Sequence, residues 1–264
     1  MIGQEQFIEK LDRYTLSTFP HSVLLLGDKG AGHIDICNYL GEKFGVSVYD
    51  ISELINTEFI NQIYLNTDPA IYTVDIHKIT EKEQNVLLKL LEEPNPLTYL
   101  ILYGESTYSL LETIVNRSYI LQMDKFTREQ LEPLVSGEDK ELILKLCSTP
   151  GQIEVANHTD MKALTKLCDT MMTSMCKANL ANALTITNKI NFKDEYDKFD
   201  LDMFIKVYIN ELSDYNTERK MEMLEILSEF KRYIDFMNDK KRYFDNFILK
   251  LWGIYRDGYK GTQE

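Results

Sequence analysis

Short apolar runs alternate with amphipathic segments over the first half of the chain. Four of the runs have the length and composition of buried strands, and segments of helical periodicity lie between them. A parallel sheet with crossover helices produces this alternation, because its strands are covered on both faces. The predicted strands are residues 22–26, 70–75, 98–103 and 118–123.

Two helices are predicted between these strands. One follows the first strand, over residues 34–44. The other begins after Thr80, which forms a capping box with Glu83, and Pro94 stops it. The first 125 residues therefore predict an α/β domain with a parallel sheet.

Beyond residue 126 the strand pattern disappears and the chain reads as helical. Residues 127–156 predict a few short helices, interrupted at Gly137 and at Pro150-Gly151. Apolar positions three to four residues apart over residues 224–237 and 244–255 predict longer helices. These stripes are either the core of a helix bundle or a surface on which subunits pack, and the pattern leaves both open.

Composition narrows the class of protein. The 264 residues carry a net charge of −13, which disfavours a stand-alone nucleic-acid binder, because phosphate contacts need clustered lysine and arginine. The N-terminus lacks the basic and apolar regions of a secretion signal, and no apolar run approaches the length of a membrane span. The four cysteines form no C-x-x-C pair, which argues against a structural zinc site and predicts no bound metal. A cytoplasmic protein with free thiols fits these features.

The stretch Gly27-Asp28-Lys29-Gly30-Ala31-Gly32-His33-Ile34 has the frame of a phosphate-binding P-loop. An intact loop reads G-x-x-x-x-G-K-[ST], in which the lysine reaches the phosphates and the hydroxyl binds Mg²⁺. Here His33 stands in the lysine position and Ile34 in the hydroxyl position. The glycine spacing is kept, whereas both side chains that act on the nucleotide are replaced.

Three segments resemble the bacterial sliding-clamp loader, a branch of the AAA+ ATPases within the DNA polymerase III holoenzyme. They are residues 1–5, the pre-strand box at residues 19–22, and the segment Asn85–Pro94, which is similar to the family's "NALLKTLEEP" box. The resemblance covers about residues 1–125. It implies a RecA-like AAA+ domain over residues 1–125, a helical lid over 126–158 and a helical collar over 159–264 that holds subunits together.

The resemblance also tests catalytic competence position by position. An active Walker B strand ends in Asp-Glu, but here Asp75 is followed by Ile76. The family's γ-phosphate sensor falls near Glu105 or Ser106, and its second sensor falls on the uncharged Gln152. We expect a chain that neither hydrolyses ATP on its own nor holds a nucleotide cofactor. The residues of this degenerate nucleotide site are Gly27, Lys29, Gly30, Gly32, His33 and Asp75.

One catalytic residue of the family has a counterpart here. Residues 113–118 resemble the family's "TIRSRC" segment, and Arg117 falls on the arginine that enters a neighbouring subunit's ATP site. The flanking residues differ, because Val115, Asn116 and Ser118 replace an arginine, a serine and a cysteine, so that a plain surface arginine is the competing interpretation. The family's four-cysteine zinc module is also missing, since residues 46–66 contain no cysteine.

A degenerate loop combined with Arg117 resembles the δ′ subunit of the loader. The resemblance implies a silent scaffold that donates an arginine finger to a neighbouring ATPase subunit. Its partners would be other clamp-loader subunits, the sliding clamp and, through the complex, primed DNA, with no membrane involved. Two alternatives stay open: an active ATPase in which Lys29 replaces the missing lysine, and a δ-like clamp-opening subunit, which would not need Arg117.

Overall fold

The computed structural model describes residues 3–176, 180–181, 184, 200–214, 219–234 and 239–261. The chain divides into two compact units. The first comprises Met1–Leu134 and Ser148–Ile153, and the second comprises Val135–Cys147 and Glu154–Glu264. The three-domain division expected from the sequence stays a prediction.

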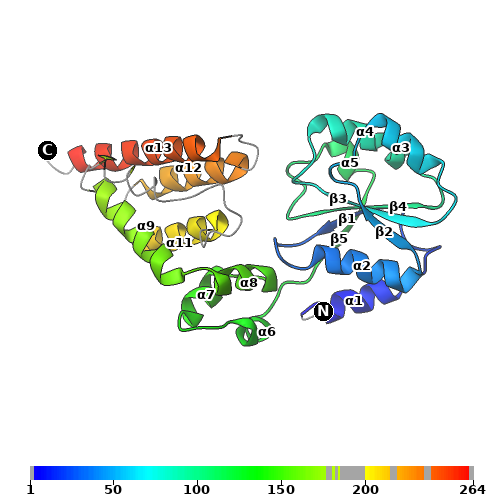
Figure 1. Ribbon diagram of the computed structural model, residues 1–264, viewed down its shortest axis with the longest axis horizontal. Coiled ribbons are helices and arrows are strands. Elements are labelled where there is room, and N and C mark those ends of the chain that lie inside the picture. The colour runs from blue at the N-terminus through cyan, green and yellow to red at the C-terminus, as the bar shows by residue number, and fades with distance from the viewer. Residues whose placement is uncertain are drawn as a thin grey trace. The chain divides into compact units, whose positions relative to one another are not determined.

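The first unit is built on a five-stranded parallel sheet (Figure 1). The strands lie in the order β2-β3-β4-β1-β5, so that β1 is flanked by β4 and β5. Ser22 lies opposite Leu100 of β4, and Val23 lies opposite Tyr119 of β5. The strands are β1 (Ser22–Leu26), β2 (Ser47–Asp50), β3 (Ala70–Asp75), β4 (Thr98–Gly104) and β5 (Tyr119–Gln122).

Helices cover both faces of the sheet, as the buried strands require. On one face α1 (Glu5–Asp12) and α2 (His33–Phe44) enclose a core that includes Phe7, Ile36 and Leu40. On the other face, at the top of Figure 1, lie α3 (Thr57–Tyr64), α4 (Glu81–Glu92) and α5 (Glu112–Val115). The two-sided α/β architecture expected from the sequence is confirmed.

The four predicted strands are present, and the structure adds a fifth. The edge strand β2 was not predicted, because three of its four residues are exposed and no apolar run marks it. The capping box of α4 is confirmed, with the Thr80 side chain accepting from the Glu83 backbone N–H and the Glu83 carboxylate accepting from the Thr80 N–H at 2.7 Å.

Short helices follow the sheet, as predicted. They are α6 (Arg128–Leu131), the 3₁₀ helix Glu132–Leu134, α7 (Lys140–Leu146) and α8 (Pro150–His158). The helical break lies before Pro150 rather than at Pro150-Gly151, which form the start of α8. Proline suits this first position, because the N–H that it lacks would have no partner within the helix.

The described residues of the second unit form helices and their connections, with no strand among them. The predicted stripes supply its core: Phe230, Phe244 and Phe247 are buried, and the ring centroids of Phe230 and Phe247 lie 4.3 Å apart. The bundle-core interpretation is confirmed at these positions, while residues 235–238 of the first stripe lie outside the described residues. Its longer helices are α9 (Met161–Cys176), α11 (Leu201–Asp214), α12 (Lys220–Tyr233) and α13 (Lys240–Gly261).

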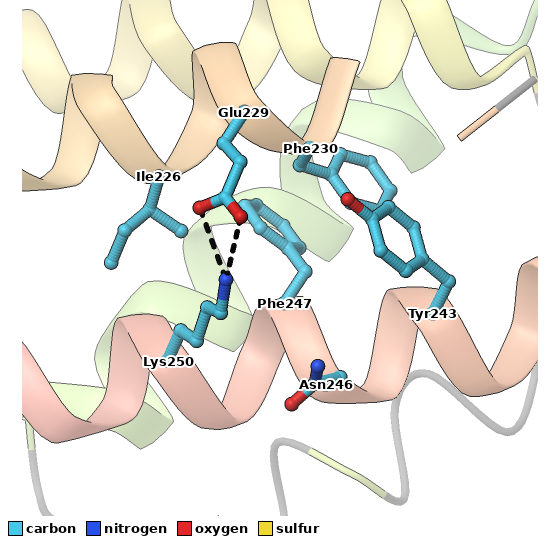
Figure 2. Close-up of a pocket in the computed structure, with 7 residues that line it drawn as sticks. All are labelled: Ile226, Glu229, Phe230, Tyr243, Asn246, Phe247 and Lys250. Atoms are coloured by element: carbon cyan, nitrogen blue, oxygen red, sulfur yellow. Dashed lines mark hydrogen bonds and ion pairs between the residues drawn. The ribbon is translucent and has the colours of Figure 1, made fainter. Parts of the chain in front are cut away.

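A shallow pocket lies between α12 and α13 (Figure 2). Lys250 reaches across it to Glu229, with Nζ–carboxylate distances of 3.0 and 3.1 Å. This ion pair, together with the stacked rings of Phe230 and Tyr243, joins the two helices. Among the described helices, none is both long and apolar enough to cross a membrane.

Candidate functional site

The glycine loop lies where a parallel sheet places a phosphate-binding loop, between the carboxyl end of β1 and the start of α2. Gly30 and Gly32 have φ angles of 81° and 93°, which residues with a side chain rarely adopt. The Gly27 N–H donates to the carbonyl of Gly104 at 3.0 Å and ties the start of the loop to β4. The backbone frame of a P-loop is therefore present.

The imidazole of His33 is folded into the unit rather than extended out of the loop. The residue is only 8% exposed, and its ring stacks on Tyr103 with centroids 5.7 Å apart. Its Nε2 atom is buried without a hydrogen bond to any described residue. Burial lowers the pKa of His33, and the weaker opposing effects come from nearby backbone acceptors and carboxylates. A neutral ring therefore stands where an intact loop has an ammonium group.

Ile34, one position further on, is an exposed apolar side chain. It is 55% exposed in the first turn of α2, where an intact loop presents a metal-binding hydroxyl. A branched hydrocarbon offers no lone pair to Mg²⁺. The two replaced side chains thus differ in position, since His33 is buried and Ile34 is exposed.

The Walker B position has become part of the core. Asp75 ends β3, and its carboxylate accepts the His77 N–H at 3.0 Å. The next residue, Ile76, is 1% exposed and covers Gly104 so closely that a Cβ there would lie 2.3 Å from Ile76 Cγ1. The water-activating carboxylate of an active site is replaced by a side chain that packs the sheet.

Glu105 follows β4 and faces the loop. Its Oε1 atom accepts the Lys29 backbone N–H at 3.3 Å. A loop of this kind normally aims its N–H groups at phosphate oxygens, so a carboxylate oxygen here occupies a phosphate's role toward one of them. Glu105 would also repel a bound phosphate.

The start of α8 packs directly on the same loop. The Gly151 N–H donates to the Gly30 carbonyl at 3.1 Å. The Lys29 carbonyl accepts from Thr149 Oγ1 at 2.8 Å and from Gln152 Nε2 at 3.1 Å. Gln152, the predicted second sensor, is therefore in the site, bonded to the loop rather than free for a nucleotide.

Arg117 lies near the amino end of β1, whereas the glycine loop follows its carboxyl end. It follows α5 and precedes β5, and Ser118 Oγ lies 2.8 Å from Ser22 Oγ at the amino end of β1. Its guanidinium donates from Nη1 to the Thr113 carbonyl at 3.0 Å, and its Nη2 lies 3.1 Å from Glu92 Oε1. The side chain is 40% exposed, so it is held by two contacts while remaining open to solvent.

The structure therefore brings together all the predicted loop residues and Asp75, and separates Arg117 from them. Sequence reasoning missed the partners Thr149, Glu105 as an acceptor, and Glu92. Ser148 and Thr149 before the first residue of α8, Pro150, are a helix-start signal. The resemblance places Gln152 at the nucleotide site, but no local pattern indicates the bond from Thr149 to the loop about 120 residues earlier.

A parallel sheet with this strand order and a glycine loop after β1 defines a RecA-like AAA+ domain. The fold agrees with a solved structure, a DNA polymerase III gamma subunit-related protein from Thermotoga maritima. That protein is 16% identical with a TM-score of 0.50, and the match covers 97% of this chain and 99% of that one.

Sequence comparisons narrow the class. The family described as "DNA polymerase III, delta subunit" matches residues 31–127. The DNA polymerase III subunit delta′ of Haemophilus influenzae is 28% identical over 153 residues, 50% of this chain and 46% of the relative. That of Buchnera aphidicola is 27% identical over 117 residues, 44% and 36% of the two chains. The matches span less than half of these relatives. The resemblance to the bacterial clamp-loader family, in its delta′-like form, is thereby confirmed.

Proposed function

We propose that this chain is a catalytically silent, δ′-like subunit of a sliding-clamp loader that acts in the cytoplasm during DNA replication. Within the complex it scaffolds the other subunits and supplies Arg117 to a neighbouring ATPase subunit. The observation that carries the proposal is the loop itself, in a chain similar to δ′ subunits: His33 is buried and uncharged, and Ile34 cannot bind a metal.

The proposed absence of ATP hydrolysis by this chain rests on the groups that phosphoryl transfer needs. Charge on the transferring phosphoryl group is stabilised by a lysine and a metal ion, and a carboxylate or amide positions the nucleophile. The lysine, the hydroxyl and the second Walker B acid are all replaced in this chain, and Glu105 adds a negative charge beside the loop. We therefore propose that the chain holds no nucleotide of its own.

The position of Arg117 supports a role in trans. The loop follows the carboxyl end of β1, whereas Arg117 lies beside its amino end. The four residue steps from Ser22 to Leu26 span roughly 13 Å. The guanidinium is held near that end of β1 by Thr113 and Glu92, and at 40% exposure it is open enough to meet a phosphate on another subunit.

The partners follow from the same proposal. Other clamp-loader subunits would pack on this chain through the helical collar, and the sliding clamp and primed DNA would be engaged by the assembled complex. The net charge of −13 supports the indirect contact with DNA, because this chain alone would repel a phosphate backbone.

The test is reconstitution with the other loader subunits of the same organism. The isolated chain should show no ATP turnover above background. The Arg117→Ala variant should assemble normally. It should lower ATP turnover at the neighbouring subunit's site by on the order of 10³-fold. Arg117→Lys should be nearly as impaired, because an ammonium cannot reproduce the planar guanidinium. Arg13→Ala, at an exposed arginine after α1, is the matched control.

The match to the family described as "DNA polymerase III, delta subunit" favours a second candidate, a δ-like subunit. Unchanged turnover with Arg117→Ala would favour that candidate. ATP turnover by the isolated chain, lost in Lys29→Ala, would instead favour an active ATPase and overturn the silent role.

A further inference from the structure

The segment Ser148–Gln152, at the start of α8, is fastened to the glycine loop by its own set of contacts. Thr149 is 1% exposed, and its hydroxyl donates to the Lys29 carbonyl at 2.8 Å. The Gly151 N–H bonds the Gly30 carbonyl, and Ser148 Oγ lies 3.2 Å from Asp28 Oδ2. Each of three successive loop residues is thus bonded to this one segment.

The approach of the two backbones is as close as glycine permits. A Cβ on Gly151 would lie 2.8 Å from Gly30 Cα, and a Cβ on Gly30 would lie 2.9 Å from Thr149 Oγ1. Real Cβ atoms essentially never lie this close to another heavy atom, so a Cβ at either position would force a neighbour to move, and at Gly151 that neighbour is backbone. The fit therefore leaves no layer of atoms between loop and segment at Gly30.

Gln152 completes the attachment. Its Oε1 accepts the Ser148 N–H at 2.9 Å while its Nε2 donates to the Lys29 carbonyl at 3.1 Å. The amide uses both of its ends, which a charged sensor residue could not do. Glu105 meets the Lys29 N–H, so both backbone groups of Lys29 are occupied.

On the basis of the proposed function, we infer that Ser148–Gln152 forms a built-in plug that occupies this loop in place of a nucleotide. The plug blocks nucleotide binding in addition to the replacement of the lysine and the hydroxyl by His33 and Ile34. Restoring the lysine and the hydroxyl, as in His33→Lys with Ile34→Thr, should therefore not restore nucleotide binding. Binding should return only when the plug is loosened as well.

Titration calorimetry with MgATP on the full chain tests this inference. Thr149→Ala with Gly151→Ala loosens the plug, because it removes one donor and places a Cβ against Gly30. We expect no binding heat from the unaltered chain or from the restored loop alone. The variant that carries all four substitutions should bind MgATP with an affinity at least ten-fold above the detection limit that the other two proteins set. The matched control combines the restored loop with Thr165→Ala and Gly253→Ala, where an added Cβ meets nothing.

The outcomes separate the two proposals. Binding by the unaltered chain would overturn the silent function. Binding by the restored loop alone would overturn the plug and leave the silent function standing, as would a folded four-fold variant that binds nothing.

Hydrogen exchange on the unaltered chain tests the plug without relying on any variant. The Gly151 amide should exchange at least about ten-fold more slowly than unprotected amides, with no change when MgATP is added. Free exchange at this amide would overturn the plug.

Discussion

The carboxyl and amino ends of the parallel strands differ in what lies beside them. At the carboxyl end of β1, the buried ring of His33 lies at the glycine loop, and Glu105 and Thr149 bond the backbone of Lys29. At the amino end, Arg117 stays exposed and is held by one carbonyl and one carboxylate. The contacts given for Arg117 and those given for the glycine loop involve different residues, so that a change at one end of the strands can leave the other end intact.

The strongest test of this comparison is Ile76→Glu, which restores the Walker B acid. Ile76 is buried among the strands, so the variant places an unpaired carboxylate in the core. We expect a loss of unfolding free energy of several kcal/mol, beyond the roughly 2–5 kcal/mol of Ile76→Ala. Denaturant unfolding measures both values.

Two controls accompany this variant. Ile34→Glu makes the same change at an exposed position and should cost little. The penalty of Ile76→Glu should also shrink at low pH, because burial raises the pKa of a carboxyl and the neutral form is tolerated better. If Ile76→Glu loses no more unfolding free energy than Ile76→Ala, water reaches this position. The carboxyl end of the strands would then be as open to solvent as the amino end.

The second test concerns His33, whose pKa is lowered by burial. In the unfolded chain the imidazole has its ordinary pKa of about 6.5, so below that pH the unfolded state binds the extra proton. The unfolding free energy should therefore fall as the pH drops through and below 6.5, by at most about 1.4 kcal/mol per pH unit from this group. His33→Asn should flatten that part of the profile.

His158→Asn is the matched control, because His158 is exposed at the end of α8. Unfolding free energies of the three proteins across this pH range give the answer. If His33→Asn follows the unaltered chain at every pH, the ring is not the buried neutral group that fills the loop.

Much of this fold is predictable from local patterns, and the exceptions have a common cause. Apolar runs mark β1, β3 and β4, and the Thr80 capping box marks α4. The strand β2 has no such run and is held by its pairing with β3 and by the packing of Val48 on the core, and α1 buries only Phe7 and Leu11. Elements held by distant partners leave weak local signals.

The site follows the same division. The replaced side chains at positions 33 and 34 are visible in the sequence because they are defined by spacing to the glycines. The resemblance places Gln152 at the nucleotide site, but the bonds from Thr149 and Gln152 to Lys29 join residues 120 and 123 positions apart, and local spacing does not predict them. The ion pair between Arg117 and Glu92 is also tertiary, although both residues lie in recognisable segments.

The smallest expected change in stability comes from the ion pair of Arg117 with Glu92, near the amino end of β1. Glu92→Gln removes the ion pair with Arg117, whose two side chains are 40% and 52% exposed. Exposed pairs of this kind contribute about 0–1 kcal/mol, and salt screens them. We expect Glu92→Gln to change the unfolding free energy by less than about 1 kcal/mol, and by still less at high salt.

A double-mutant cycle with Arg117→Ala, run at two salt concentrations, measures the coupling between these two residues. A coupling well above about 2 kcal/mol, insensitive to salt, would make Arg117 a structural arginine that is not free to leave its partner. The weak coupling that we expect leaves the guanidinium able to exchange Glu92 for the more highly charged phosphate of a neighbour, as a role in trans requires.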